Sequence, residues 1–355
     1  MLTELDDLLT HQTFETHDRV FLDDPRWTER FIFEVHDRTG DVFLFAGLGI
    51  YPNTGYMDGF AICWHDGQQH NLRAGRELGD DRWTLHAGPL RFDIVKPMQT
   101  WRLAADDAGF GFSFEIEFNR RCRPFQMPTM LLERDGEIMV GYSHFDQGGE
   151  YSGWIEVDGR RYPVDGWTGE RDRSWGVRPA SARTRRGLHT WLPIHFDDVA
   201  IWLWTRDDRH GKQAGLSGAV RPVDMVNPGP IDEITSFRHD LEIERVGDHS
   251  LIAGGRLHIG TASGRKIDLE VEPLGPVISL VGGGYGGAHA QGTPKGPLFV
   301  DGEIWDFREP GSFAAAVPHS ILERPCAFHW GDKVGHGCYE LCIGEYEPLG
   351  IGPIE

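Results

Sequence analysis

The sequence is poor in positive charge. Its 355 residues include 35 Lys and Arg against 55 Asp and Glu, which gives a formal net charge of −20. A protein that binds a nucleic-acid backbone needs a basic surface, because every phosphate carries a negative charge. This charge balance argues against nucleic acid as a partner.

Long hydrophobic runs are also missing. The longest, such as Val42–Ile50, reach about nine residues, whereas a membrane-spanning helix needs roughly 20. The first residues, MLTELDDLLTHQ, carry acids where a signal peptide would carry lysines before its apolar stretch. The sequence therefore predicts a cytoplasmic protein without an integral membrane segment.

Cysteine is scarce, and its spacing suggests no bridge or metal knuckle. Five cysteines are spread widely along the chain: Cys63, Cys122, Cys326, Cys338 and Cys342. They form no CxxC pair, which argues against a disulfide framework and a zinc knuckle. His329 and His336 lie near Asp332, Cys338 and Glu340, but their spacing matches no helical pair of ligands. We expect no metal site and no cofactor.

Glycine, by contrast, is abundant, and apolar residues recur with a period of two. The 46 glycines and 21 prolines favour short strands joined by turns over long helices. In Phe110–Phe118, apolar side chains alternate with small or acidic ones, as in a half-buried antiparallel strand. Similar runs are Arg30–Val35, Asp240–Val246 and Lys266–Val271. The sequence predicts an all-β fold, either a sandwich or a barrel.

Turn signals and a faint duplication indicate how the strands are organised. Four Asp-Gly pairs are typical of tight turns: Asp66-Gly67, Asp135-Gly136, Asp158-Gly159 and Asp301-Gly302. Segments 87–118 and 234–273 share a rhythm of strand, turn, strand, acidic turn and strand. We expect two similar β units, residues 1–180 and 181–355, joined by a crossover near residues 170–188. The first twelve residues predict one short helix, with Thr3 as its N-cap.

A glycine-rich segment in the second half has the form of a dinucleotide motif without its context. Gly282, Gly284 and Gly287 satisfy GxGxxG, but the residues that follow, AHAQGTPKGP, cannot start the helix that such a site needs. We interpret the segment as a loop at a barrel mouth, where Tyr285 and His289 line the ligand entrance.

The segment DGWTGERDRSWGVRP concentrates groups that are costly to bury. If it is extended, alternation places Asp172 and Ser174 on one face and Arg171, Arg173 and Trp175 on the other. The segment is therefore a candidate for chemistry.

Two interpretations of the acid in this segment remain open. In an aromatic-lined pocket, burial would raise the pKa of Asp172, which could then act as a general acid beside Arg171 or Arg178. Alternatively, Asp172 pairs with an arginine and has a purely structural role.

Aromatic side chains follow shortly afterwards, in LHTWLPIHFDDVAIWLWTRDD. His189 and Trp191 share one strand face, and Trp202 and Trp204 share a face of the next strand. They could form the wall of a pocket for a large apolar ligand, or stabilise a carbocation through their ring quadrupoles. The alternative is an ordinary aromatic core.

The run HFDQGGEYSGWIEVDGRRYPVDGWTGERDRSWGVRP, residues 144–179, resembles the central motif of the AttH-like and hydroxyneurosporene-synthase-like proteins. That group is related to the carotenoid 1,2-hydratases and the fungal lipocalin-type cyclases. The stretches GPLRFDIVKPMQTWRL and LVGGGYGGAHAQGTPKG strengthen the resemblance, which covers most of the chain.

The resemblance implies two tandem lipocalin-like barrels or half-barrels, with a hydrophobic pocket near the region between them. It also implies an aspartate that protonates a C=C bond, after which water captures the cation. Asp172 best matches that aspartate, with His189 and Trp191 as pocket neighbours. In the hydratases a histidine typically follows the aspartate, whereas Arg173 stands here.

Together these features predict an enzyme without a cofactor that acts on a hydrophobic small molecule, isoprenoid, steroid-like or aromatic. The reaction would be proton-initiated hydration, isomerisation or cyclisation, with Asp172 as acid and His189 positioning water or relaying a proton. The expected substrate-binding residues are Arg171, Trp175, Arg178, Trp191, Trp202, Trp204, Tyr285 and His289. The alternatives are a non-catalytic carrier of an apolar ligand and a scaffold; edge strands could serve a larger assembly or a homodimer.

Overall fold

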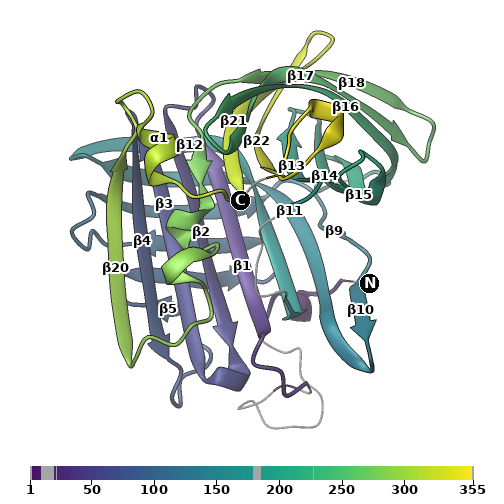
Figure 1. Cartoon of the computed structure of the whole chain (residues 1–355). Helices are drawn as coiled ribbons and strands as arrows, with labels where there is room; N and C mark the ends of the chain where they lie inside the picture. Colours follow the sequence, from purple (N-terminus) through teal and green to yellow (C-terminus); the bar gives the residue numbers. More distant parts are fainter. Residues whose placement is uncertain (1, 9–19, 21, 179–184, 227, 354–355) are drawn as a thin grey trace.

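The computed structural model describes residues 2–8, 20, 22–178, 185–226 and 228–353, and most of them lie in antiparallel β-strands. The strands form two sheets, one of thirteen strands and one of nine (Figure 1). Each sheet curls into a closed or nearly closed barrel, which confirms the predicted all-β fold with two lipocalin-like units. None of the helices in these ranges has the length and apolar character needed to cross a membrane.

The first barrel is built mainly from the first half of the chain. Its strands follow in the order β20 (Leu298–Asp306), β4 (Gln68–Glu77), β3 (Tyr56–His65), β2 (Val42–Tyr51), β1 (Trp27–His36), β12 (Arg160–Val177), β11 (Glu137–Val157), β8 (Phe112–Arg120), β7 (Thr100–Ala105), β6 (Leu90–Lys96) and β5 (His86–Ala87). Two short strands, β9 (Phe125–Gln126) and β10 (Met130–Arg134), also pair with β11.

The second barrel comes from the second half of the chain. Its order is β18 (Lys266–Pro273), β17 (His249–Thr261), β16 (Asp232–Val246), β15 (Gln213–Pro222), β14 (Val199–Asp207), β13 (Leu188–His195), β22 (Lys333–Ile343), β21 (Leu322–Trp330) and β19 (Ile278–Ser279). Pairing between β18 and β21 closes this barrel.

Helices are few and short. Within the described ranges they are the 3₁₀ turns η1 (Glu4–Asp7), η2 (Pro52–Thr54), η3 (Leu280–Gly283), η4 (Gly287–His289) and η5 (Glu347–Leu349), and one α-helix, α1 (Ser312–Ala316). The predicted N-terminal helix is thus a single turn as far as Leu8, and the rest of its expected range lies outside the described residues.

Alternation along the strands separates the core from the surface, as the sequence pattern predicts. On β8, Phe112, Phe114 and Phe118 are buried in the first barrel, whereas Glu115 faces outward. The segments that suggested a duplication form matching meanders, β6–β7–β8 in one barrel and β16–β17–β18 in the other. Apolar residues from alternate positions therefore fill the interior of each barrel.

Three of the four predicted Asp-Gly turns are present. The Asp-Gly pairs at 66–67, 135–136 and 158–159 each have two positive φ angles between paired strands, as a type I′ turn requires. The fourth prediction is wrong, because Asp301 and Gly302 lie inside β20. Asp301 forms an ion pair with Arg73 on β4 at 3.0 Å. A side chain at Gly302 would come within 2.1 Å of the Asn71 carbonyl oxygen, so a glycine is needed for close strand contact.

The predicted crossover near residues 170–188 is wrong in its first part. Residues up to Val177 belong to β12, at the centre of the first sheet between β1 and β11. The connection to β13 begins only after them, and residues 179–184 lie outside the described ranges. The proposed division at residues 180 and 181 stays a prediction, since β20 from the second half joins the first sheet.

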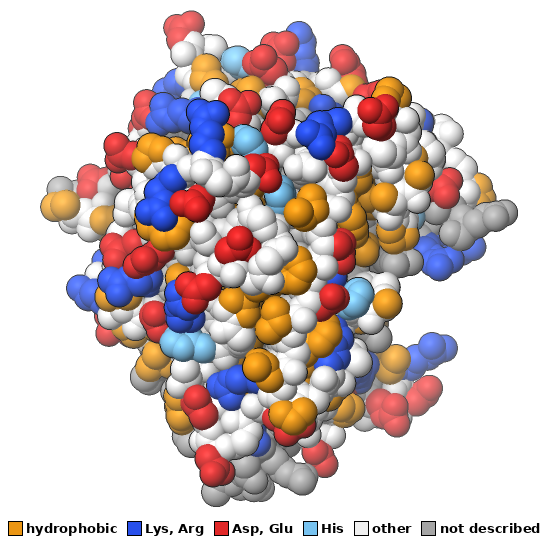
Figure 2. All heavy atoms as spheres, turned by 90° about the vertical axis from the view of Figure 1, so that its left-hand side faces the viewer, with side chains coloured by type: hydrophobic (Ala, Val, Ile, Leu, Met, Phe, Trp, Pro, Cys, Tyr) orange, Lys and Arg blue, Asp and Glu red, His pale blue; other side chains and the backbone are white. Residues whose placement is uncertain are grey.

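The edge strand β20 carries an exposed apolar row. Leu298, Val300 and Ile304 are among the exposed large hydrophobic residues. Figure 2, which views the molecule from the left-hand side of Figure 1, shows apolar side chains interspersed with acidic and basic ones. The homodimer remains a prediction.

Candidate active site

A cavity of about 240 Å³ lies where the two barrels meet. Its apolar lining consists of Ile32, Phe45, Met130, Val140, Tyr142, Trp191, Trp204, Tyr285 and Ile321. Its charged and titratable lining consists of Arg30, His144, Asp172, Arg178, His189, Arg206 and Glu340. An apolar wall with a few converging polar groups is the usual composition of a small-molecule site.

The first barrel contributes a histidine between two aspartates. Strands β11 and β12 pair so that Asp146 lies opposite Asp172, and alternation brings His144 to the same face. The His144 Nε2 atom lies 3.1 Å from Asp146 Oδ2 and 3.2 Å from Asp172 Oδ2. Trp191 of the second barrel donates a hydrogen bond from Nε1 to Asp146 Oδ1 at 2.9 Å, which fixes the inner carboxylate.

These contacts determine where the proton resides. Burial opposes the charge on His144, but Asp146 and Asp172 outweigh it and raise the pKa of the imidazole well above its usual value. Burial also raises the pKa of Asp146 to about 6, despite the neighbouring His144. A buried histidine with two carboxylate partners therefore holds a proton at neutral pH.

The pKa of Asp172 moves in the direction opposite to the prediction. Burial alone would raise it, but His144, Arg178 and Arg30 lower it below its ordinary value. Asp172 is thus the anion of an ion pair in which His144 holds the proton.

The second carboxylate oxygen of Asp172 has no hydrogen-bond partner among the described residues. This atom, Oδ1, is buried, and a buried oxygen without a donor is costly in free energy. The side chain as a whole is 14% exposed and lines the cavity. The exposed part of the Asp172 side chain is therefore what a molecule in the cavity would contact.

The second barrel contributes another titratable pair. The His189 Nε2 atom lies 2.7 Å from Glu340 Oε1, and both side chains line the cavity. The imidazole also packs edge-on against Trp204, with ring centroids 6.2 Å apart. Each barrel thus supplies one histidine–carboxylate pair to a single cavity.

Two arginines are packed against aromatic rings of the lining. The Arg30 guanidinium carbon lies 4.6 Å from the Tyr285 ring centroid, and that of Arg178 lies 4.2 Å from the Tyr142 ring. Burial raises the pKa of Tyr285 to about 12, so its hydroxyl stays protonated. These stacked cations hold the aromatic walls in place.

Six of the ten residues predicted for the site line the cavity: Asp172, Arg178, His189, Trp191, Trp204 and Tyr285. The other four lie elsewhere, for reasons that strand geometry makes clear. Arg171 and Trp175 occupy the opposite face of β12, as the predicted alternation requires. Arg171 pairs with Asp7 at 2.8 Å, and Trp175 packs against Phe145. Arg171 therefore cannot polarise Asp172 in the cavity.

Neither of the remaining two residues lines the cavity. Trp202 is fully buried behind the lining, where its ring centroid lies 5.9 Å from that of His144. It supports the histidine from behind. His289 lies 3.4 Å from Asp301, outside the lining, where it extends the ion pair of β20.

Sequence reasoning missed His144, Asp146 and Glu340. The motif HFD places His144 and Asp146 on one face of a strand, and this H-x-D spacing is a signal that could have identified them. The sequence did not reveal the register that brings this motif opposite Asp172. The residue after Asp172 is Arg173 and not a histidine, but His144 on the neighbouring strand places an imidazole beside Asp172.

Solved structures share this fold over most of their length. A protein described as AttH, from Nitrosomonas europaea, has a TM-score of 0.57 and 14% identity, covering 95% of this chain and 98% of its own. Kievitone hydratase from Nectria haematococca has a TM-score of 0.50 and 12% identity, covering 89% of this chain and 88% of its own. CghA, crystallised with Sch210972, has a TM-score of 0.52 and 12% identity, covering 90% of this chain and 89% of its own.

At these identities the likeness concerns the fold, and at that level it confirms the resemblance to AttH-like proteins. No curated protein sequence matches the chain. The model of a family of unknown function, DUF8625, matches residues 2–352.

Proposed function

The chain belongs to the family of unknown function DUF8625, and we propose that it is an enzyme that protonates a hydrophobic small molecule without a cofactor. Hydration, isomerisation or cyclisation of an isoprenoid, steroid-like or aromatic compound would follow. The observation that carries the proposal is the partly exposed Asp172 carboxyl group in the lining of an aromatic-walled cavity, with a proton held on His144 behind it.

The first step is proton transfer to a carbon of a C=C bond. His144 first passes its proton to the Asp172 carboxylate and becomes neutral, and the protonated carboxyl group then gives this same proton to the carbon and returns to its anion. The π electrons form the new C–H bond and leave a cation on the adjacent carbon. Trp191, Trp204 and Tyr285 present ring faces or edges to the cavity, and an aromatic quadrupole stabilises such a charge.

The second step discharges the cation. In a hydration, water adds its oxygen to the cationic carbon and gives up one proton, and a base must accept it. His189, oriented by Glu340 at 2.7 Å, is the candidate for positioning this water. The proton eventually returns to the pair of His144 and Asp172, so the net reaction adds one water molecule. Loss of a proton, or attack by a second double bond, would instead give isomerisation or cyclisation.

Two further points support an enzyme over a carrier. A carrier needs only apolar lining, whereas this cavity contains two carboxylates, those of Asp172 and Glu340, each beside a histidine. Kievitone hydratase and CghA, which share the fold, lend the proposal support of a general kind.

Native mass spectrometry of protein purified from its own host tests the proposal by identifying a retained apolar ligand. That compound, or its dehydrated or unsaturated counterpart, is then offered to the wild type and to Asp172→Asn. We expect the variant to fold and bind but to lose turnover. An Asp172→Asn protein with unchanged turnover would overturn the assignment of the acid, and a ligand released unaltered by the wild type would favour the carrier.

A further inference from the structure

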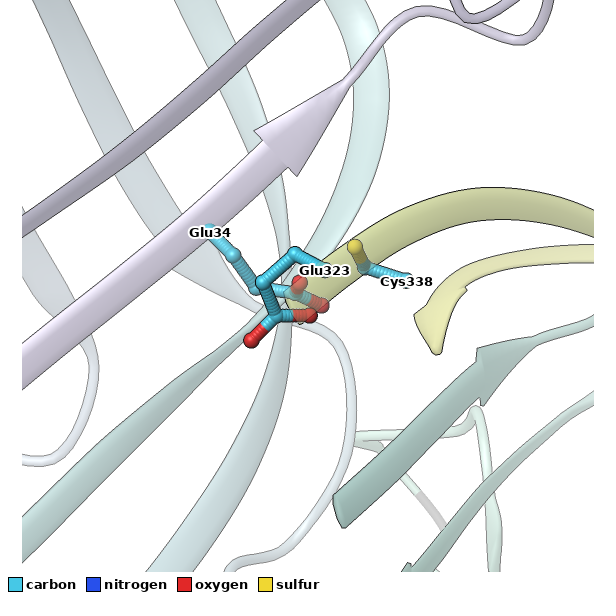
Figure 3. Close-up of side chains that lie close together, drawn as sticks. All are labelled: Glu34, Glu323 and Cys338. Carbon is cyan, nitrogen blue, oxygen red and sulfur yellow. The ribbon is translucent and has the colours of Figure 1, made fainter. Parts of the chain in front are cut away.

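We propose that Glu34, Glu323 and Cys338 together bind one divalent cation of the zinc class at the junction of the two barrels. Glu34 comes from β1 of the first barrel, Glu323 from β21 and Cys338 from β22 of the second (Figure 3). Their ligand atoms all lie within 4.8 Å of one another. Such a cation would connect the barrels directly.

The cluster forms the layer beneath the cavity. On β1, Ile32 lines the cavity, and Glu34 follows two positions later on the same face. On β22, Glu340 lines the cavity, and Cys338 precedes it by two positions. Glu323 lies directly opposite Glu340 in the pairing of β21 with β22. The site is thus close to the cavity but distinct from its lining.

The close polar neighbours of the two carboxylates are the Cys338 thiol and, for Glu323, the Glu340 carboxyl group. Glu34 is 1% exposed and Glu323 is 0% exposed, and none of their four buried oxygen atoms has a hydrogen bond of good geometry among the described residues. Cys338 is also fully buried. Buried carboxylates ordinarily have a cation, a donor or a metal beside them, because an isolated buried charge is very costly. This arrangement needs positive charge from bound protons or from a cation.

Neighbouring basic side chains are already engaged. Arg221 forms an ion pair with Glu170 at 2.9 Å, and His189 contacts Glu340 at 2.7 Å. Without a metal, Glu34 and Glu323 would hold protons, because a buried unpaired charge is very costly; a metal would displace those protons on binding.

The ligand chemistry favours zinc over calcium or magnesium. One thiolate with two carboxylates matches a borderline metal, whereas the two lighter ions prefer oxygen alone. Three protein ligands leave a fourth tetrahedral position for water. Small side-chain rotations suffice to bring atoms within 4.8 Å of one another around a shared ion, with bonds of roughly 2.0–2.3 Å.

Cobalt(II) is the probe for this site, because thiolate coordination gives it a charge-transfer absorption in the near ultraviolet. The full-length protein is produced in zinc-depleted medium with added Co²⁺, so that metal enters as the chain folds. We expect about one Co²⁺ per chain with this absorption, and its loss in Cys338→Ser. The matched control is Cys63→Ser, a buried cysteine of β3 outside the cluster, which should retain both. No bound Co²⁺, or the same absorption in Cys338→Ser, would overturn the proposal.

Near-isosteric variants keep the test decisive if Cys338→Ser does not fold. With a metal, Glu34→Gln and Glu323→Gln should each lower the metal content and the melting temperature. With protonated acids and no metal, the same variants would be neutral or stabilising, because glutamine replaces an uncharged carboxyl group and adds a donor. Two results together would refute the site. The variants would be as stable as the wild type, and a chelator present during refolding would leave the melting temperature of the wild type unchanged.

Discussion

Replacing Asp7 with asparagine tests whether the buried arginine of β12 is structural. Asp7 and Arg171 are both 0% exposed, and Asp7 Oδ1 lies 2.8 Å from Arg171 Nη1. The Asp7 carboxylate also accepts hydrogen bonds from the Met98 backbone N–H at 2.6 Å and from Trp101 Nε1 at 3.0 Å. Asparagine keeps an oxygen for these donors but removes the charge. The guanidinium cannot lose its proton to compensate.

The size of the expected loss in unfolding free energy depends on the contacts that Arg171 keeps in the variant. Breaking a buried ion pair by removing one partner costs about 3–5 kcal/mol. Gln147 Oε1 still accepts hydrogen bonds from Arg171 at 3.0 and 2.8 Å, and the Phe145 ring centroid lies 5.2 Å from its guanidinium carbon. We therefore expect the lower end, about 3 kcal/mol. For a domain of this size, that corresponds to a melting temperature lower by roughly 6–12 °C.

Thermal melts and urea titrations of the wild type and the Asp7→Asn variant measure this difference. The control is Glu156→Gln, which breaks an exposed pair with Arg161, with side chains 37% and 57% exposed. Such surface pairs contribute no more than about 1 kcal/mol. If Asp7→Asn is no more destabilising than Glu156→Gln, the buried pair does not stabilise the first barrel as described.

Three further predictions concern the junction of the barrels. The pKa of His144 is higher in the folded protein than in the unfolded chain, so its contribution to stability should be complete below pH about 6.5 and be lost as pH rises through the folded-state pKa. Free energies of unfolding measured across this pH range should show the loss in the wild type but not in His144→Gln. Arg221→Met should destabilise the protein more at pH 8 than at pH 6. Burial raises the pKa of Glu170 to about 7, so the carboxyl group that loses its arginine partner can take up a proton at the lower pH. An equal loss of unfolding free energy at the two pH values, measured by urea titration, would contradict this. Trp204→Ala removes an aromatic wall and should reduce the ligand retained in native mass spectra at least tenfold; unchanged retention would place the ligand elsewhere.

The fold could be predicted because it depends on local patterns. Alternation in Phe110–Phe118 identified a half-buried strand, and Asp-Gly pairs identified three of the hairpin turns. The turn predicted at Asp301-Gly302 was wrong because a glycine can allow close packing of two strands as well as a turn. The pattern at Gly302 alone does not distinguish these two uses.

The site could be predicted only in part because it depends on register and on distant partners. Alternation correctly separated Asp172 from Arg171, but the partner of Arg171 is Asp7, 164 positions earlier in the chain. His144 faces Asp172 only through the pairing of β11 with β12. The expected rise in the pKa of Asp172 was wrong because burial was considered without the neighbouring His144.

Deuterium incorporation tests proton-initiated chemistry at Asp172 most directly. The ligand identified by native mass spectrometry is incubated in D₂O with the wild type, with Asp172→Asn, and with Glu156→Gln as a folded control. We expect one deuterium bound to carbon with the wild type and the control, and none with Asp172→Asn. Incorporation that is equal in all three proteins, or absent from all three, would contradict this expectation.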